Sequence, residues 1–147
     1  MSAKPIFKEV IRPPLWLILF MYFMLDSLVL AIWAAFDSVA AINALAIATV
    51  LGLVGIYLAT SSIQVRDGEL IIKKAHIPLA YLTEPIVIKK REFALQRTRF
   101  ADPAAYFATT FWISEGIKVK VQDERDPTPY WLISTRRAEE LKKILEN

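Results

Sequence analysis

The sequence predicts a membrane hairpin of two helices followed by a small α+β domain. Three observations support this fold class. Residues 15–36 and 39–59 are long apolar runs, the segment after Thr60 alternates with a period of two, and the last residues form an amphipathic helix. We expect three parts: a cytoplasmic N-terminal segment (1–13), a two-helix transmembrane hairpin (14–60) and a cytoplasmic domain (61–147).

Length and composition limit the domain content of the chain. Its 147 residues, of which 55% are hydrophobic, leave room for one modest domain beside a membrane anchor. The sequence has no cysteine, which excludes disulfides, thiolate metal sites and cysteine nucleophiles. A large multi-domain enzyme is therefore excluded.

Each apolar run is long enough to cross a bilayer. At about 1.5 Å per residue, about 20 helical residues span the hydrocarbon layer of about 30 Å. The first run is interrupted only by Asp26 and Ser27, and the second has Asn43 and Thr49 as its polar side chains. Two alternatives are buried helices of a soluble protein and a cleaved signal peptide. The small remainder of the chain and the length of the first run disfavour them.

The placement of basic residues predicts the orientation of the hairpin. Lys4, Lys8 and Arg12 precede the first run. Every other Lys and Arg lies at position 66 or later. The connection at Asp37 and Ser38 has none. By the positive-inside rule, both termini are expected on the cytoplasmic side.

The short connection also predicts how the two helices pack. Pairing residues at equal distances from it brings Ala31 near Ala44 and Asp26 near Thr49. Small residues at 44, 48 and 52 recur every four positions, a face that allows close approach of helices in a bilayer. Packing within one chain is favoured, and a homo-oligomer remains an open alternative.

Asp26 is the most unusual residue of the predicted spans. It lies near the bilayer midplane, where an ionised carboxylate is costly, and neither span contains a basic residue. We expect it to be protonated or hydrogen bonded. A polar contact with Thr49, a second copy or a partner helix is favoured over a proton or cation relay, because two helices are too few to enclose a pathway.

The segment after Thr60 is predicted to form about six short strands. The dipeptide Asp67-Gly68 between alternating stretches predicts a β-hairpin of residues 62–66 and 69–74. The other strand candidates are 77–79, 86–88 after a turn at Glu84-Pro85, 106–112, 116–122 and 130–134. Residues 89–96 are expected to form a short polar helix or loop.

The chain ends in a predicted amphipathic helix. Thr135 is a candidate cap, and Ala138, Leu141, Ile144 and Leu145 form one apolar stripe. Such a helix needs a sheet to cover. The predicted domain is therefore a small antiparallel sheet or partial barrel closed by a C-terminal helix.

Several segments resemble known families. The stretch from Asp67 to Leu79 is similar to the start of bacterial pleckstrin-homology-like (PH-like) domains. Residues 101–106 (ADPAAY) and 126–137 (DPTPYWLISTRR) resemble a family of small actinobacterial two-span membrane proteins of unknown function, DUF3093-like. The resemblance implies a multi-pass protein of the bacterial inner membrane with a PH-like cytoplasmic domain, and it implies no catalytic residue.

No pattern of a catalytic, metal or nucleotide site is found in the sequence. His76 is the sole histidine, expected in a turn, and it has no neighbouring ligands at metal-binding spacing. No glycine-rich phosphate loop occurs among the four glycines. We therefore expect a protein that is not an enzyme and has no metal or cofactor.

Seven basic residues are the candidate lipid- or partner-binding residues of the domain. They are Lys89, Lys90, Arg91, Arg97, Arg99, Arg136 and Arg137. For a domain tethered at the bilayer, anionic headgroups are the nearest partner, and a solvated charged face is the alternative. A net charge of +3 is low for nucleic-acid binding, which we do not expect.

Two functions follow from these features. The first is a non-enzymatic membrane protein that presents a PH-like module at the cytoplasmic face to a protein or to anionic lipid. The alternative is a small subunit of a membrane complex or transporter that uses Asp26 in the bilayer.

Overall fold

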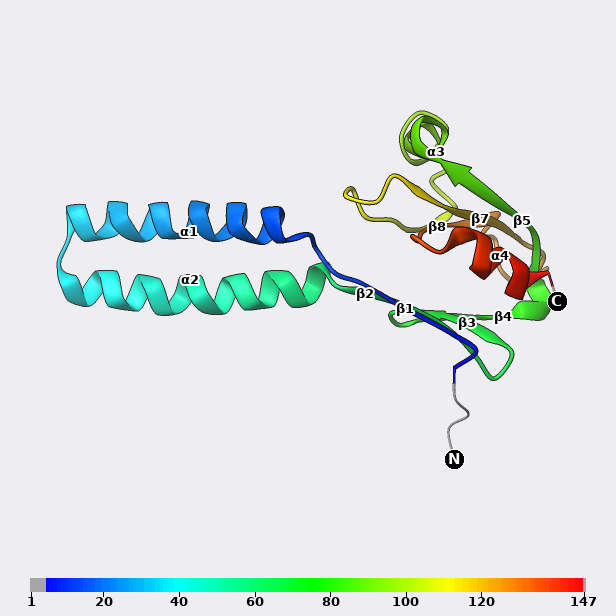
Figure 1. Ribbon diagram of the computed structural model, residues 1–147, viewed down its shortest axis with the longest axis horizontal. Helices are drawn as coiled ribbons and strands as arrows, with labels where there is room; N and C mark the ends of the chain where they lie inside the picture. The colour runs from blue at the N-terminus through cyan, green and yellow to red at the C-terminus, as the bar shows by residue number, and fades with distance from the viewer. Residues whose placement is uncertain (1–4, 147) are drawn as a thin grey trace. The chain divides into compact units, whose positions relative to one another are not determined.

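The computed structural model describes residues 5–146, which form two compact units (Figure 1). One unit is Ile11–Ser61 and contains the two long helices. The other combines the described residues up to Val10 with those from Ser62 onward and contains the sheets. This second unit therefore contains residues that precede the helical hairpin in the sequence and residues that follow it.

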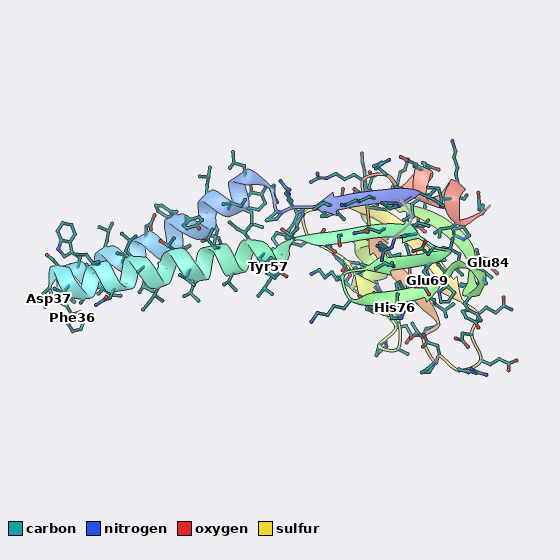
Figure 2. The ribbon with its side chains drawn as sticks, turned by 90° about the horizontal axis from the view of Figure 1, so that it is seen from below. Phe36, Asp37, Tyr57, Glu69, His76 and Glu84 are labelled. Atoms are coloured by element: carbon teal, nitrogen blue, oxygen red, sulfur yellow. The ribbon has the colours of Figure 1, made fainter. Side chains whose placement is uncertain are left out.

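The hairpin consists of α1 (Leu15–Ala35) and α2 (Ser38–Ala59), which lie side by side (Figure 1). The predicted runs are thus helical, with ends shifted by one residue. Asp37 ends the connection as the N-cap of α2, and its carboxylate accepts a hydrogen bond of 2.8 Å from the backbone N–H of Ala40. Figure 2 shows Phe36 and Asp37 at this connection. Both helices are long and apolar enough to cross a membrane.

Small residues of α2 form the seam between the helices. Ala48 and Gly52 are the buried residues of α2, and none of α1 is buried. A Cβ atom added to Gly52 would stand 2.7 Å from the ring of Tyr22, and one added to Gly55 would stand 3.3 Å from the sulfur of Met21. These contacts join positions at nearly equal distances from the connection, which confirms the predicted register.

The first sheet has the strand order β1-β2-β3-β4. Its strands are β1 (Phe7–Ile11), β2 (Ser61–Arg66), β3 (Glu69–Ile72) and β4 (Ala75–Pro78). The predicted hairpin of β2 and β3 is confirmed, with Arg66 opposite Glu69. Asp67 and Gly68 both have positive φ, 54° and 76°, as a type I′ turn requires. His76 lies in β4 opposite Ile71 and is exposed, so the expected turn at this residue is wrong. Figure 2 labels His76 and Glu69 on these neighbouring strands.

Strand β1 was not predicted. It lies within the segment 1–13, beside β2, and the N–H of Ile6 donates a hydrogen bond of 2.9 Å to the carbonyl of Val65. Phe7 and Ile11 are 1% and 2% exposed, so both contribute to the core. Part of the predicted N-terminal segment is therefore a strand of the sheet that follows the hairpin, and Lys4 lies outside the described residues.

The second sheet has the order β5-β7-β8-β6. Its strands are β5 (Leu82–Lys89), β6 (Tyr106–Ala108), β7 (Glu115–Val121) and β8 (Tyr130–Ser134), with a short 3₁₀ helix, η1 (Leu79–Tyr81), before β5. Most pairs are antiparallel, but β6 runs parallel to β8, which corrects the expectation of a wholly antiparallel sheet. The predicted turn at Glu84 is an irregularity inside β5, where the register shifts and Glu84 has φ 49°.

Two short helices pack on the second sheet. They are α3 (Lys90–Arg97), so the segment expected as a polar helix or loop is a helix, and α4 (Ala138–Leu145), which contacts β5 and β7. Phe93 of α3 is 1% exposed and belongs to one cluster with Ile88, Tyr130 and Leu132. Leu141 of α4 is fully buried. The domain thus has the expected α+β class, built from two sheets.

Gly116 should be sensitive to any side chain. A Cβ atom at this position would overlap the carbonyl oxygen of Ile133 and stand 2.5 Å from the Phe93 ring. We predict that Gly116→Ala lowers the free energy of unfolding of the domain by about 2–3 kcal/mol, since β7 and β8 must separate to accommodate it. Thermal unfolding of the full chain measures this. Gly68→Asn is the control, because Asn tolerates positive φ and nothing lies within 4 Å. Equal stability of the Gly116→Ala variant and the wild type would contradict the packing.

Candidate functional site

Asp26 and Thr49 are both exposed on the hairpin. The Thr49 hydroxyl donates a hydrogen bond of 2.8 Å to the carbonyl of Leu45 on its own helix. Ser27 is satisfied in the same way by the carbonyl of Phe23. No hydrogen bond or ion pair joins Asp26 to Thr49 or to any other residue among those described. The expected contact between the two side chains within one chain is therefore not made.

Three of the seven predicted basic residues meet at the start of α4. Lys89, Arg136 and Arg137 line a pocket of about 290 Å³. Glu115, Glu139 and Glu140 line the same pocket, so its charges balance. Lys89 lies 3.9 Å from Glu139. The pocket does not offer the excess of positive charge that would attract an anion.

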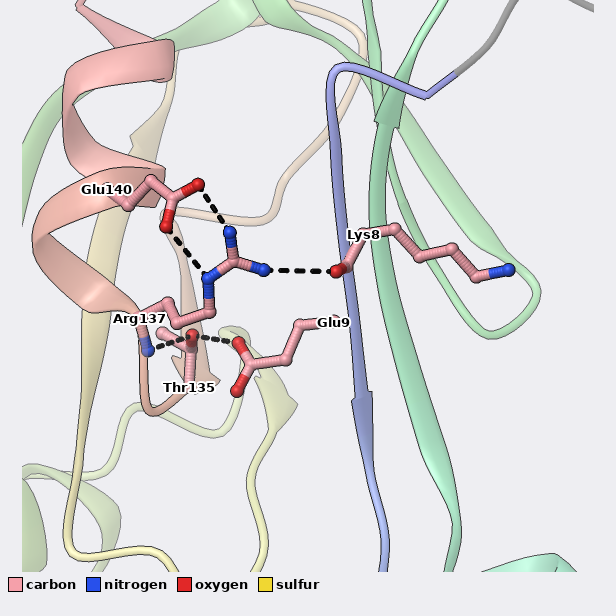
Figure 3. Close-up of polar contacts among 5 residues, drawn as sticks. All are labelled: Lys8, Glu9, Thr135, Arg137 and Glu140. Atoms are coloured by element: carbon pink, nitrogen blue, oxygen red, sulfur yellow. Dashed lines mark hydrogen bonds and ion pairs between the residues drawn. The ribbon is translucent and has the colours of Figure 1, made fainter.

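Arg137 is the most constrained of these cations. It forms a bidentate pair with Glu140, and it donates a hydrogen bond of 3.2 Å to the carbonyl of Lys8 (Figure 3). The hydrogen bonds with Glu140 raise the pKa of Arg137 above its ordinary value. Its guanidinium also lies 4.8 Å from the centre of the Phe7 ring. Arg137 therefore connects β1 to α4 and is not free for a ligand.

Five of the seven basic residues have no ion pair among the described residues, and four of these five are exposed; the fifth, Arg97, is half-buried. The exposed four are Lys90, Arg91, Arg99 and Arg136. The first three belong to residues 89–99, where five bases stand against one acid, Glu92. Positive charge that is available to a partner is therefore concentrated at α3 and directly after it.

Two exposed phenylalanines follow this basic helix. Phe100 is 59% exposed, and its N–H is bonded to the carbonyl of Leu95 at the end of α3. Phe111 is 61% exposed. The Arg97 side chain donates a hydrogen bond of 2.9 Å to the carbonyl of Thr110, which ties the end of α3 to the loop that carries Phe111. We call Arg99, Phe100 and Phe111 the aromatic–basic rim.

The loop that carries Phe111 is held from both sides. The N–H of Thr110 donates a hydrogen bond of 2.9 Å to the hydroxyl of Ser134, a fully buried residue of β8. Ile113 is 4% exposed and anchors the end of the loop. The prediction of one strand over 106–112 is therefore wrong for its second half, which is this loop. The observed strand ends at Ala108. The break was not evident because aromatic residues, which are typical of strands, stand at both ends of the stretch 106–112.

A buried carboxylate joins β1 to the segment before α4. Glu9 is 9% exposed, and its carboxylate accepts a hydrogen bond from the Thr135 hydroxyl (Figure 3). It accepts another of 3.1 Å from the N–H of Arg136. The Thr135 hydroxyl also accepts a hydrogen bond of 3.1 Å from the N–H of Arg137. The predicted capping role of Thr135 is wrong in detail, because the N-cap of α4 is Arg137 and has no side-chain cap. The Thr135 hydroxyl instead donates a hydrogen bond to the Glu9 carboxylate.

Among residues 5–146 there is no group of three or more His, Asp or Glu side chains placed to hold a metal ion. His76 stands on an exposed strand position. The acidic turn at 123–126 is organised locally, since Asp126 accepts a hydrogen bond of 2.9 Å from the N–H of Thr128. The hydrogen bonds from Thr128 lower the pKa of Asp126.

Fold and surface together define a class of protein: a small α+β domain of two sheets whose first two strands flank an apolar helical hairpin. Residues 6–145 match the model of a family described as a protein of unknown function (DUF3093). The chain belongs to this family. No curated protein and no solved structure matches it.

The Glu9 contact predicts a selective effect of substitutions at Thr135. Thr135→Val keeps the shape of the side chain but removes a donor from a buried carboxylate, so we predict a loss of about 1–3 kcal/mol in the free energy of unfolding. Thr135→Ser retains the hydroxyl and should lose less than Thr135→Val. Chemical unfolding of both full-length variants measures the difference. Equal losses would assign the effect to packing and contradict the hydrogen bond.

Proposed function

We propose that this chain is a non-enzymatic, multi-pass protein of the bacterial inner membrane whose cytoplasmic domain binds anionic lipid headgroups. The hairpin serves as the anchor, with both termini on the cytoplasmic side. The aromatic–basic rim and the exposed cations of α3 form the lipid-binding surface. The alternative partner for the same surface is a membrane protein, and nucleic acid is not proposed.

The properties of α1 and α2 support membrane insertion. They have 21 and 22 residues, lengths that match a bilayer, and most of their large side chains are exposed. Exposed apolar surface on this scale is unstable in water. The absence of Lys and Arg between Arg12 and Arg66 supports the orientation.

The connections support a domain that stays near the bilayer. Residues 12–14 separate β1 from α1, and Thr60 alone separates α2 from β2. Any bilayer that contains both helices is therefore within reach of the domain. In this setting a weak lipid contact suffices, since the covalent link supplies a high local concentration.

The aromatic–basic rim is the observation that carries the proposal. Anionic membrane surfaces attract Lys and Arg, and amphipathic or aromatic side chains settle at the headgroup level. At about 1 kcal/mol for each basic residue near the surface, Lys90, Arg91 and Arg99 together contribute about 3 kcal/mol. The two exposed phenylalanines, near the end of α3, add apolar contact. This total can orient a tethered domain.

The C-terminal helix and the resemblance of residues 67–79 support a PH-like module. α4 covers β5 and β7 in the manner expected of a closing helix. The parallel pairing of β6 with β8 differs from the wholly antiparallel sheet expected from the sequence.

A second candidate function, a subunit of a membrane complex, is favoured by the exposed and unpaired Asp26.

Lipid contact can be tested with a fluorescent label beside Phe111. Because the chain has no cysteine, Ser114→Cys can be labelled alone with an environment-sensitive fluorophore in the full-length protein. We predict a blue-shifted emission in nanodiscs containing phosphatidylglycerol relative to phosphatidylcholine alone. Arg91→Glu with Arg99→Glu should abolish the shift, because reversed charges are repelled by the headgroups.

Two controls make this result specific. Lys74→Glu with Arg125→Glu changes the net charge equally at exposed positions away from the rim and should preserve the shift. A label at Glu124→Cys should report no difference between the lipids. The same emission from the label at position 114 in both kinds of nanodisc would refute the proposed surface.

A further inference from the structure

We propose that the hairpin forms a two-fold symmetric dimer in which the Asp26 carboxyl of each copy is hydrogen bonded to the Thr49 hydroxyl of the other. This inference rests on the proposed insertion of α1 and α2 in a membrane. It does not depend on the lipid-binding surface of the domain. Asp26, Thr49 and the residues one helical turn from them form the contact.

Asp26 and Thr49 lie at the same depth. Each is the twelfth residue of its helix, near the middle. The contacts of Tyr22 with Gly52 and of Met21 with Gly55 join positions whose numbers add to 74 and 76. The numbers 26 and 49 add to 75, so the two residues stand at matching heights on the antiparallel helices.

The two side chains also lie on the same side of the hairpin. Asp26 follows Leu25, a half-buried residue one turn from Met21 and Tyr22 on the face of α1 that contacts α2. Thr49 follows Ala48, which is buried. One residue corresponds to a rotation of about 100° around a helix. Because the helices are antiparallel, the same rotation carries both residues to one face. Both are exposed there.

Two-fold symmetry turns this arrangement into a self-complementary surface. Copies with the same orientation in a membrane are related by an axis along the bilayer normal, which conserves depth. Rotation about an axis beside this face places α1 of one copy opposite α2 of the other. Asp26 then stands opposite Thr49 twice in each dimer, as an isologous interface requires.

The hydrogen-bond inventory defines the chemistry of the pair. The Thr49 hydroxyl donates its only hydrogen to Leu45 but still has lone pairs to accept with. Asp26 in its neutral acid form has one O–H to donate. The neutral form is also the one that an apolar environment favours. The pair is therefore an acid O–H bonded to the oxygen of Thr49.

A second copy suits this surface better than an unrelated helix. Any partner must bring a polar group to the depth of Asp26, because an unpaired polar group in hydrocarbon is costly. The chain itself carries such a group at that depth and on that face. Leu30 and Leu45, one turn from Asp26 and Thr49, are both exposed and can pack against the second copy.

Disulfide trapping in membranes tests the geometry. The full-length chain with Leu30→Cys and Leu45→Cys places the two thiols at equal depth on the proposed face, because each is four residues from a member of the pair. Mild oxidation should give a covalent dimer. The matched control is Met24→Cys with Leu51→Cys, which lie at equal depth on the other face and are also exposed. It should give little dimer.

Substitutions at the polar pair test the chemistry in the same assay. Asp26→Leu and Thr49→Val should each lower the dimerisation constant about tenfold, since two membrane hydrogen bonds are lost. Asp26→Asn, which retains a donor, and Thr49→Ser, which retains the oxygen, should preserve dimerisation. No dimer from the 30/45 pair, equal dimer from the 24/51 pair, unchanged trapping in Asp26→Leu, or trapping to a different protein would overturn the proposal.

Discussion

The structure depends on the pairing of β1 with β2. These neighbouring strands are separated in sequence by the whole hairpin, so the sheet forms only when the two ends of a segment of about 50 residues come together. The antiparallel packing of α1 and α2 brings these ends together, since it returns the chain to the side from which it left. Folding of the hairpin and completion of the first sheet are thus coupled through chain connectivity.

The buried contacts of β1 extend this coupling to the second sheet. Glu9 accepts hydrogen bonds from the residues between β8 and α4, and Arg137 is bonded to Glu140 and to the carbonyl of Lys8. The five residues of β1 therefore pair with β2 in the first sheet and also contact the residues at the start of α4. Because a buried carboxylate is stable only while its donors are present, displacement of β1 would disrupt both contacts together.

The elements with strong local signals were predictable, and those defined by distant contacts were not. The Asp67-Gly68 turn, both apolar helices and the stripe of α4 follow from local chemistry. Strand β1 was missed because the inward residue Glu9 is charged and the outward Val10 is apolar, which reverses the usual pattern. The basic residues could be listed from sequence. Which of them are paired depends on the fold, because no spacing rule relates Lys89 to its partner Glu139.

The energy balance of α1 explains why Asp26 is important for the proposed dimer. Eleven Leu, Ile, Phe and Val residues of α1 favour insertion by roughly 5 kcal/mol in total, and a central Asp opposes it by about 3 kcal/mol. The second helix has no charged residue and carries no such cost. Insertion of α1 is therefore the weaker step, assisted by packing against α2. Pairing of Asp26 with Thr49 of a second copy would offset part of the remaining cost, so that dimerisation and stable insertion reinforce each other.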